Sequence, residues 1–360
     1  TGADWDVAYL AAGLLARHHR AGLELLAEIV TAPTFPEPEI ERLRRQRLAE
    51  ILRRSQDPSA LADDRLAPLI YRGTVYAGSL LGDEKSVSVL DRDSMLEFYR
   101  GHYSLAGSTL IAVGDFAPEE LLRQAESLLG RRGETERPPD PPQIRPEPLP
   151  GITVHIVDRP GAAQTELRLG HPGVFRTHPD YVPLMVMNTL LGGKFTSRIN
   201  LNLRERHGYT YGATSRFVPR QGPGPFVVSA AVATESAGAA AREVLYELRR
   251  IREDLVEPEE LEATRNYMSG VFPYTVQTIG DLAKRLETMA VYGLPDDYFD
   301  SYLLRLAKVT RENILDVASR HLAPERMAIV AVGPPEALER QFEGMGPVTV
   351  WSPQGEPQLV

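Results

Sequence analysis

The 360-residue chain contains no cysteine. Disulfide bonds and metal sites built from thiolates are therefore excluded. Proteins without cysteine occur in reducing and in oxidising compartments, so this absence leaves the cellular location open.

Long apolar runs and an excess of positive charge are also missing. No apolar run approaches the roughly 20 residues that a membrane-spanning helix needs, so we expect no membrane span. The formal net charge of −9 argues against a nucleic-acid-binding surface. A hydrophobic content of 42% and a charged content of 25% are typical of a globular protein, and the length suffices for two domains.

Two motifs of cofactor chemistry are absent as well. The eight histidines form neither H-E-x-x-H nor its inverse, H-x-x-E-H, so the chain cannot build a complete zinc site of that kind. The segment GGKFTS (192–197) resembles a phosphate-binding loop only superficially, because the spacing G-x-x-x-x-G-K is missing. We therefore reject nucleotide binding.

Hydrophobic periodicity predicts an α+β protein with alternating strands and helices. Strands are expected at 4–13, 110–115, 152–159, 165–173 and 226–234, and helices at 14–31, from 36 onward, at 91–100, 117–130 and 179–191. The proline-rich segment 132–150 has the composition of an extended linker. We thus predict a first domain at 1–131, a linker at 132–150, a second domain at 151–350 and a tail at 351–360.

An internal repeat relates the two predicted domains. Leu90–Gly114 aligns without a gap to Val309–Gly333, so that His102 meets His321, and 36–45 matches 257–266. Residues 1–131 therefore mirror about 222–350. Nothing before Thr1 mirrors 151–221, so we expect the first domain to lack its opening segment, which was removed or lies outside this chain.

The stretch 192–212, GGKFTSRINLNLRERHGYTYG, is the most informative part of the sequence. Phe195, Ile199 and Leu203 recur every four residues and predict an apolar helix stripe. Gly208 is placed to end that helix in the left-handed conformation. A helix is therefore expected to lead directly into a strand.

That strand begins with two tyrosines. Tyr209 and Tyr211 alternate with Thr210, which predicts that both phenols lie on one strand face, while Arg204, Arg206 and His207 lie at the end of the preceding helix. A guanidinium and a phenol donate hydrogen bonds without reacting, which suits the binding of a carbonyl oxygen or a carboxylate. An ordinary helix end whose cations complement the helix dipole is the alternative interpretation.

These residues resemble a known family. SRINLNLRERHGYTYG (197–212), preceded by NTLLGGKFT and followed by LVEPEELEATRNYMSG (255–270) and VAVG, resembles the carboxyl-terminal domain of M16 (pitrilysin-type) zinc metallopeptidases. The resemblance spans nearly the whole chain. It implies two homologous LuxS/metallohydrolase-like domains, each an antiparallel sheet packed with helices, with the first domain lacking its opening segment.

The resemblance also implies roles for particular residues. In the family, H-x-x-E-H in one domain binds zinc, and an arginine and a tyrosine of the opposing domain hold the substrate backbone. The family's R-x6-Y pattern matches Arg204 and Tyr211, and so selects Arg204 over Arg206 and Tyr211 over Tyr209. Tyr209, on the same predicted strand face, stays a further candidate for substrate binding. Glu50 matches a later zinc-binding glutamate and is a vestigial candidate here. We expect no cofactor in this chain and zinc in a partner subunit.

The implied function is that of a non-catalytic subunit of a two-subunit zinc protease. Its partner would be a homologous H-x-x-E-H subunit in a heterodimer, or a second copy of the chain, and its substrate a peptide. Two alternatives stay open. One is a self-sufficient zinc endopeptidase whose motif lies upstream of Thr1, and the other is a structural subunit without peptidase activity.

Overall fold

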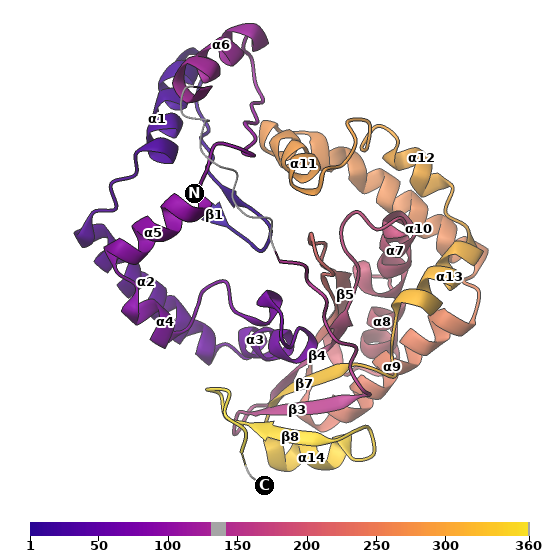
Figure 1. Cartoon of the computed structure of the whole chain (residues 1–360). Coiled ribbons are helices and arrows are strands. Elements are labelled where there is room, and N and C mark those ends of the chain that lie inside the picture. Colours follow the sequence, from indigo (N-terminus) through magenta and orange to yellow (C-terminus); the bar gives the residue numbers. More distant parts are fainter. Residues whose placement is uncertain (131–141, 359–360) are drawn as a thin grey trace. The chain divides into compact units, whose positions relative to one another are not determined.

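The computed structural model describes residues 1–130 and 142–358, which separate into two compact units (Figure 1). The first, here the helical unit, comprises Thr1–Ile51, Leu80–Pro142 and Tyr274–Leu294. The second, here the sheet unit, comprises Leu52–Ser79, Gln143–Pro273 and Pro295–Val360. These units are defined by packing, whereas the predicted domains follow the internal repeat, and their boundaries differ. Most of the predicted linker lies outside the described residues.

The sheet unit is built on a six-stranded sheet with the order β5-β6-β4-β7-β3-β8. Its strands are β3 (Thr153–Asp158), β4 (Gln164–Pro172), β5 (Thr210–Phe217), β6 (Pro225–Ala233), β7 (Ala328–Gly333) and β8 (Val348–Trp351). The mixed helix-and-sheet class is confirmed. The sheet is not wholly antiparallel, because β3 pairs in parallel with both β7 and β8. Helices intervene between β3 and each of these strands, so the chain can return in the same direction.

Helices cover both faces of this sheet. The helices of the sheet unit are α3 (Pro58–Ile70), α7 (Tyr181–Asn188), α8 (Arg198–Asn200), α9 (Ala237–Glu253), α10 (Pro258–Val271), α12 (Tyr302–Ala307), α13 (Arg311–His321) and α14 (Pro335–Phe342). Helix α3 packs on one face, against β4 and β7, and α9 packs on the other, against β4 and β6. Shorter helical turns are η2 (Val75–Ala77), η4 (Thr189–Gly193), η5 (Leu201–Arg206) and η6 (Thr234–Ser236). Among the described residues, no helix has both the length and the apolar character needed to cross a membrane.

Successive side chains of β4 point to opposite faces of the sheet. Leu167 and Leu169 point into the main hydrophobic core, where they are 1% exposed. Arg168 points to the other face, where its Nε donates to Asp63 Oδ1 of α3 at 2.7 Å. Gly170 lies on that face too, and a Cβ there would come within 2.8 Å of Leu66 in α3. The sheet is therefore buried on both sides.

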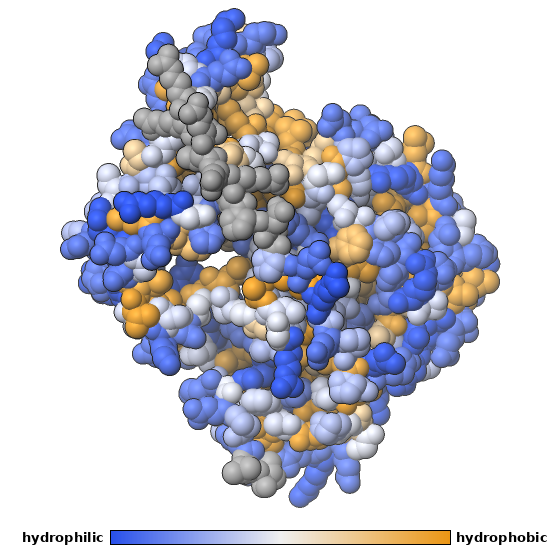
Figure 2. All heavy atoms as spheres, in the orientation of Figure 1, coloured by the Kyte–Doolittle hydropathy of each residue, from blue (hydrophilic) through white to orange (hydrophobic). Residues whose placement is uncertain are grey.

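The helical unit has a much smaller core. Its elements are η1 (Ala16–His18), α1 (His19–Thr31), α4 (Glu84–Val89), α5 (Arg92–His102), α6 (Pro118–Leu129), α11 (Ile279–Tyr292) and the two-residue strands β1 (Gly2–Ala3) and β2 (Ala8–Tyr9). The unit boundaries fall inside α2 (Glu37–Gln56) and η7 (Phe272–Val276). Its described buried apolar residues are Leu23, Ala27, Ile40, Val87 and Ala125. Apolar surface is visible beside α6 in Figure 2.

Two predicted strands of the helical unit are wrong. Within 4–13 only Ala8–Tyr9 forms a strand, β2, which pairs with β1 ahead of that stretch, and 110–115 forms no strand, with Leu110 48% exposed. Its repeat counterpart, 329–333, lies in β7 and is fully buried between β3 and β4. A strand needs neighbours that pair with its backbone, and the described residues supply none to 110–115.

The helices of the first copy of the repeat correspond to those of the second, and so do individual hydrogen bonds. Arg92 Nε donates to the carbonyl of Phe35, and its counterpart Arg311 Nε donates to the carbonyl of Val256, the counterpart of Phe35. Helices α5 and α13 both have 11 residues and both begin with a capping box. The same arginine ties equivalent segments together in each unit, which supports the internal repeat.

Arg44 and Arg265 form a second matched pair. Arg44 donates to the carbonyls of Ser88 at 2.9 Å and Leu90 at 2.5 Å. Arg265 donates to the carbonyls of Ala307 at 3.0 Å and Val309 at 3.3 Å, which occupy the corresponding repeat positions. The first copy thus keeps the helical framework of the second.

A buried histidine joins two strands at the parallel edge of the sheet. His155 in β3 is 8% exposed, and its Nδ1 accepts a hydrogen bond from Trp351 Nε1 at 3.1 Å. Its Nε2 lies 3.0 Å from Thr153 Oγ1. Burial, with a smaller contribution from Arg65, lowers the pKa of His155 from 6.5 to about 4. The folded state therefore holds this imidazole neutral.

We predict that His155 makes the protein less stable as the pH falls from 6.5 towards 4. In this range the unfolded chain binds a proton at His155 and the folded chain does not, so the loss approaches about 1.4 kcal/mol per pH unit. Urea unfolding of the native chain and of His155→Gln, at several pH values, would measure the difference. The exposed His18→Gln is the control. A His155→Gln variant with the native pH slope would contradict the prediction.

Candidate functional site

The candidate site lies on the chain between α7 and β5. After Ser197 the chain forms one helical turn, α8, and continues as the π-helical η5. Within η5 the backbone N–H of His207 donates to the carbonyl of Asn202, five residues earlier. Gly208 follows with a φ of 66°, which confirms the predicted left-handed conformation at the end of the helix. Such π-helical turns are frequent at functional sites.

The predicted apolar stripe is right in two of its three positions. Ile199 and Leu203 are fully buried in the core. Phe195 instead precedes the helix and is 65% exposed. The helix begins at Arg198 because Lys194 and Ser197 have extended backbones, so Phe195 falls outside the helical repeat.

Two buried asparagines anchor this segment to β5. Asn188 Nδ2 donates to the carbonyl of Ser215 at 3.0 Å, while Ser215 Oγ donates to Asn188 Oδ1 at 2.9 Å. Asn200 Oδ1 accepts from the backbone N–H of Ala213 at 3.0 Å, and its Nδ2 donates to the carbonyl of Phe195 at 2.6 Å. The helical segment and the strand are thereby held in one register.

Close packing reinforces these hydrogen bonds. A Cβ on Gly192 would lie 2.4 Å from Ser215 Oγ and 2.5 Å from the Ser215 backbone nitrogen. Only glycine allows this approach. The glycine pair of GGKFTS therefore has a packing role here, and Lys194 Nζ donates to Thr264 Oγ1 at 2.8 Å.

Arg204, the first predicted site residue, lies near the end of η5. Its guanidinium carbon is 4.3 Å from the ring centroid of Phe195, a cation–π distance. Its Nη1 is 3.5 Å from Glu205 Oε1 but has no hydrogen-bond partner among the described residues. The side chain is 34% exposed. Arg204 thus combines a supported guanidinium with an unused donor.

The two tyrosines do not share one environment, contrary to the predicted alternation. β5 begins at Thr210, and a bulge between Thr210 and Ala213 interrupts the alternation. Tyr209 packs against the core and stacks on His207 with ring centroids 5.0 Å apart. Tyr211 is 89% exposed. A bulge commonly redirects a side chain, and here it leaves the Tyr211 phenol in solvent.

Arg204 and Tyr211 come from elements that are joined by backbone hydrogen bonding. The N–H of Tyr209 donates to the carbonyl of Leu203 at 2.8 Å, which ties η5 to the chain entering β5. In the part of the chain that the structure describes, no hydrogen bond links the two side chains directly. The Tyr211 hydroxyl is therefore open to a ligand, whereas the Arg204 Nη1 has no partner but is buried, so that a ligand could reach it only after a shift of the side chain.

Glu50 lies elsewhere, in α2 within the helical unit. Its Oε2 is 3.9 Å from Arg47 Nη1, the spacing of an ordinary i,i+3 pair on a helix. Residues 1–130 and 142–358 contain no cluster of histidine and carboxylate ligands around Glu50 that could hold a metal ion. With H-x-x-E-H absent as well, the described residues do not fit a zinc site of the family's kind.

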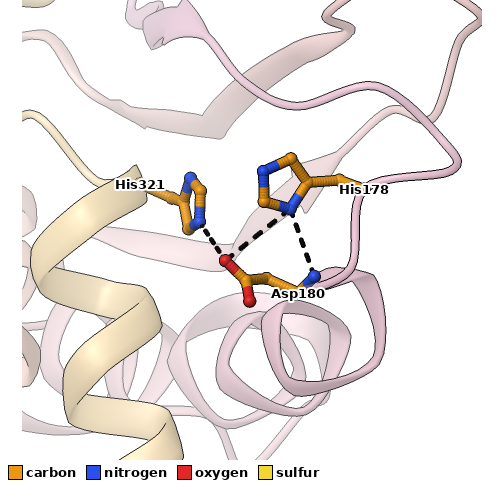
Figure 3. A group of neighbouring side chains, drawn as sticks. All are labelled: His178, Asp180 and His321. Carbon is orange, nitrogen blue, oxygen red and sulfur yellow. Dashed lines mark hydrogen bonds and ion pairs between the residues drawn. The ribbon is translucent and has the colours of Figure 1, made fainter.

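Sequence reasoning missed a different cluster, formed by His178, Asp180 and His321 (Figure 3). One ligand atom from each residue lies within 4.8 Å of the others. His321 Nε2 is 2.7 Å from Asp180 Oδ2, and His178 Nδ1 is 3.6 Å from the same oxygen. The spacing H-x-D at 178–180 was the only local signal, because His321 is 141 residues from Asp180.

Charge favours an ionised carboxylate in this cluster. Burial opposes ionisation of Asp180, but hydrogen bonds from His321 and Arg320 lower the pKa of Asp180 below its usual value. Burial also lowers the pKa of His178, and so do the neighbouring His321 and Arg320. An anionic Asp180 therefore lies between two imidazoles, at the start of α7 and the end of α13.

The chain is similar to known proteins over most of its length. Residues 90–268 match the family model described as "Peptidase M16 inactive domain". A Rickettsia bellii protein named "Uncharacterized zinc protease" is 23% identical over 326 residues, covering 89% of this chain and 76% of that protein. The rat mitochondrial-processing peptidase subunit beta is 29% identical over 175 residues, covering 47% of this chain and 34% of that protein.

A solved structure agrees with these relatives. The crystal structure titled as a peptidase M16 inactive domain from Pseudomonas fluorescens superimposes with a TM-score of 0.81 at 27% sequence identity. The match covers 89% of this chain and 76% of that chain. The similarity thus extends through both the sheet unit and much of the helical unit.

We predict that Asn200→Ala destabilises the sheet unit by about 1–3 kcal/mol, because it leaves the buried N–H of Ala213 without its acceptor. Urea unfolding would measure the change. Asn266→Ala, at an exposed position of α10, is the matched control and should stay within about 0.5 kcal/mol of the native chain. Equal stability of the two variants would show that the Asn200 amide does not hold the segment to β5.

Proposed function

Because the chain belongs to the peptidase M16 family, we propose that it is a non-catalytic subunit that binds peptide and supplies Arg204 and Tyr211 to the zinc site of a partner. This proposal rests on a contrast: the chain lacks the family's zinc-binding motif but keeps the family's arginine and tyrosine. The chain has no H-x-x-E-H motif, yet an anchored framework carries Arg204, whose buried Nη1 has no hydrogen-bond partner among the described residues, and the exposed Tyr211.

The two side chains suit the polarisation of a peptide carbonyl. The Arg204 guanidinium and the Tyr211 hydroxyl are hydrogen-bond donors. Donors held in place before the reaction stabilise the negative charge that develops on a carbonyl oxygen. Phe195 beneath the guanidinium and the asparagine anchors reduce the reorganisation needed when substrate binds.

The position of β5 suits an extended substrate. In the described sheet β5 is an edge strand, paired on one side with β6. An unpaired strand edge can accept an extended peptide through backbone hydrogen bonds. A peptide bound there would run past Tyr211, which lies near the beginning of the strand.

The partner is a homologous subunit that carries H-x-x-E-H. The relative named as a subunit of the mitochondrial-processing peptidase supports a two-subunit arrangement, in which this chain would form a heterodimer. Zinc bound by the partner would supply an activated water for peptide hydrolysis. This chain would bind and orient the substrate and stabilise the oxyanion.

A second candidate is a self-sufficient zinc endopeptidase. The relatives named zinc protease match this chain over most of its length, and 24% of the Rickettsia bellii protein lies beyond the match. In that case H-x-x-E-H would lie in the same polypeptide, upstream of Thr1. Arg204 and Tyr211 would act in the same way, but no second subunit would be needed.

We predict that the chain cleaves peptides only when mixed with an H-x-x-E-H subunit. Arg204→Ala and Tyr211→Phe should each reduce kcat of the mixture by about 10²–10³, as expected for a lost oxyanion donor. The assay is the cleavage of a fluorogenic peptide library by each chain alone and by the pair.

The controls are Arg206→Ala and Tyr267→Phe. Arg206 is an arginine two residues from Arg204, and Tyr267 is an exposed tyrosine of α10, so both variants should leave turnover unchanged. Full activity of both Arg204→Ala and Tyr211→Phe would overturn the proposed role. An inactive mixture that still forms a stable complex would favour a structural subunit.

A further inference from the structure

The cluster of His178, Asp180 and His321 contains the ligand types that zinc prefers. Two imidazoles and one carboxylate converge from the segment before α7 and from the last residue of α13 (Figure 3). Zinc and similar divalent transition ions bind imidazole nitrogen together with carboxylate oxygen, and three protein ligands leave a position for water. No other described group of three histidine, aspartate or glutamate residues meets the same spacing.

Two of the three distances between ligand atoms require only a small adjustment, and the third, between the two imidazoles, is within 4.8 Å. Ligand atoms around a tetrahedral zinc ion lie about 3.3–3.6 Å apart, given bonds of about 2.0–2.2 Å. His178 Nδ1 and Asp180 Oδ2 are already 3.6 Å apart. His321 Nε2 and Asp180 Oδ2, at 2.7 Å, would separate by less than about 1 Å as their hydrogen bond is replaced by bonds to the ion.

The cluster is accessible from the surface. The side chains of His178, Asp180 and His321 are 22%, 18% and 13% exposed. An ion could therefore enter without opening the core, and water could complete its coordination. The end of α13 also favours a cation, because helix carboxyl termini carry partial negative charge.

Existing hydrogen bonds compete with an ion. Arg320 Nη1 lies 2.5 Å from Asp180 Oδ2, and the backbone N–H of Asp180 donates to His178 Nδ1 at 3.1 Å. Arg320 also binds Asp316 through Nε and Nη2, and its side chain is 46% exposed. It can therefore leave Asp180 while keeping its pair with Asp316.

We propose that His178, Asp180 and His321 form a binding site for a divalent transition-metal ion such as zinc, which links the start of α7 to the end of α13. The site differs from the family's zinc motif in donor set and in location on the chain. It contains no glutamate that could act as a base. Its effect is to stabilise the sheet unit, since the ion binds the folded state and adds to its stability.

The test is the titration of the purified, tag-free chain with zinc by calorimetry and with cobalt by visible absorption. We expect one saturable site, cobalt bands of a four-coordinate ion, and a higher unfolding temperature with zinc. His178→Gln and His321→Gln should each weaken binding by more than the about 10–100-fold typical of a lost outer-shell contact.

His102→Gln is the matched control, because His102 ends α5 at the repeat position of His321 and has no such partners. Arg320→Gln provides an opposite test, since removal of the competing guanidinium should tighten zinc binding. Far-UV circular dichroism checks that each variant is folded. Absence of saturable zinc binding to the native chain, or native affinity in both histidine variants, would overturn the site and leave the peptidase proposal intact.

Discussion

The buried amide contacts between the helical segment and β5 are the constraint on which the candidate site depends. Asn188 and Asn200 exchange hydrogen bonds with Ser215, Ala213 and the carbonyl of Phe195. Because these groups are buried, each would cost free energy without its partner. The segment therefore has one favourable register on the strand, and that register determines where Arg204 and Tyr211 lie.

The same constraint explains how the half-buried Arg204 and the exposed Tyr211 can form a defined site. Arg204 is supported by the ring of Phe195, whose carbonyl is bound by Asn200. Tyr211 lies in the bulge between Thr210 and Ala213. The backbone N–H of Ala213, where regular pairing resumes, donates to the same asparagine. A buried framework thus positions a half-buried guanidinium and a solvent-exposed phenol on neighbouring segments.

The two copies of the repeat show that its helices form from local hydrogen bonds, whereas its strand forms only where neighbouring strands pair with it. Arg92 and Arg311 make the same contact in the two units, and α5 and α13 have the same length. Helix hydrogen bonds are local, so the helices form in both copies. LIAVG and IVAVG are both apolar and share their last three residues, but among the described residues only the second has strands on both sides and becomes β7.

The sequence by itself determined what depends on neighbours along the chain: the main strands of the sheet unit, the capped helices, the left-handed Gly208 and the R-x6-Y pattern of Arg204 and Tyr211. Tertiary structure decided the rest. It placed Phe195 outside the helix, created the bulge that separates Tyr209 from Tyr211, and left 110–115 without a strand. It also brought His321 to Asp180 across 141 residues. Periodicity and capping are local, whereas strand pairing, bulges and convergent side chains require partners that no local pattern specifies.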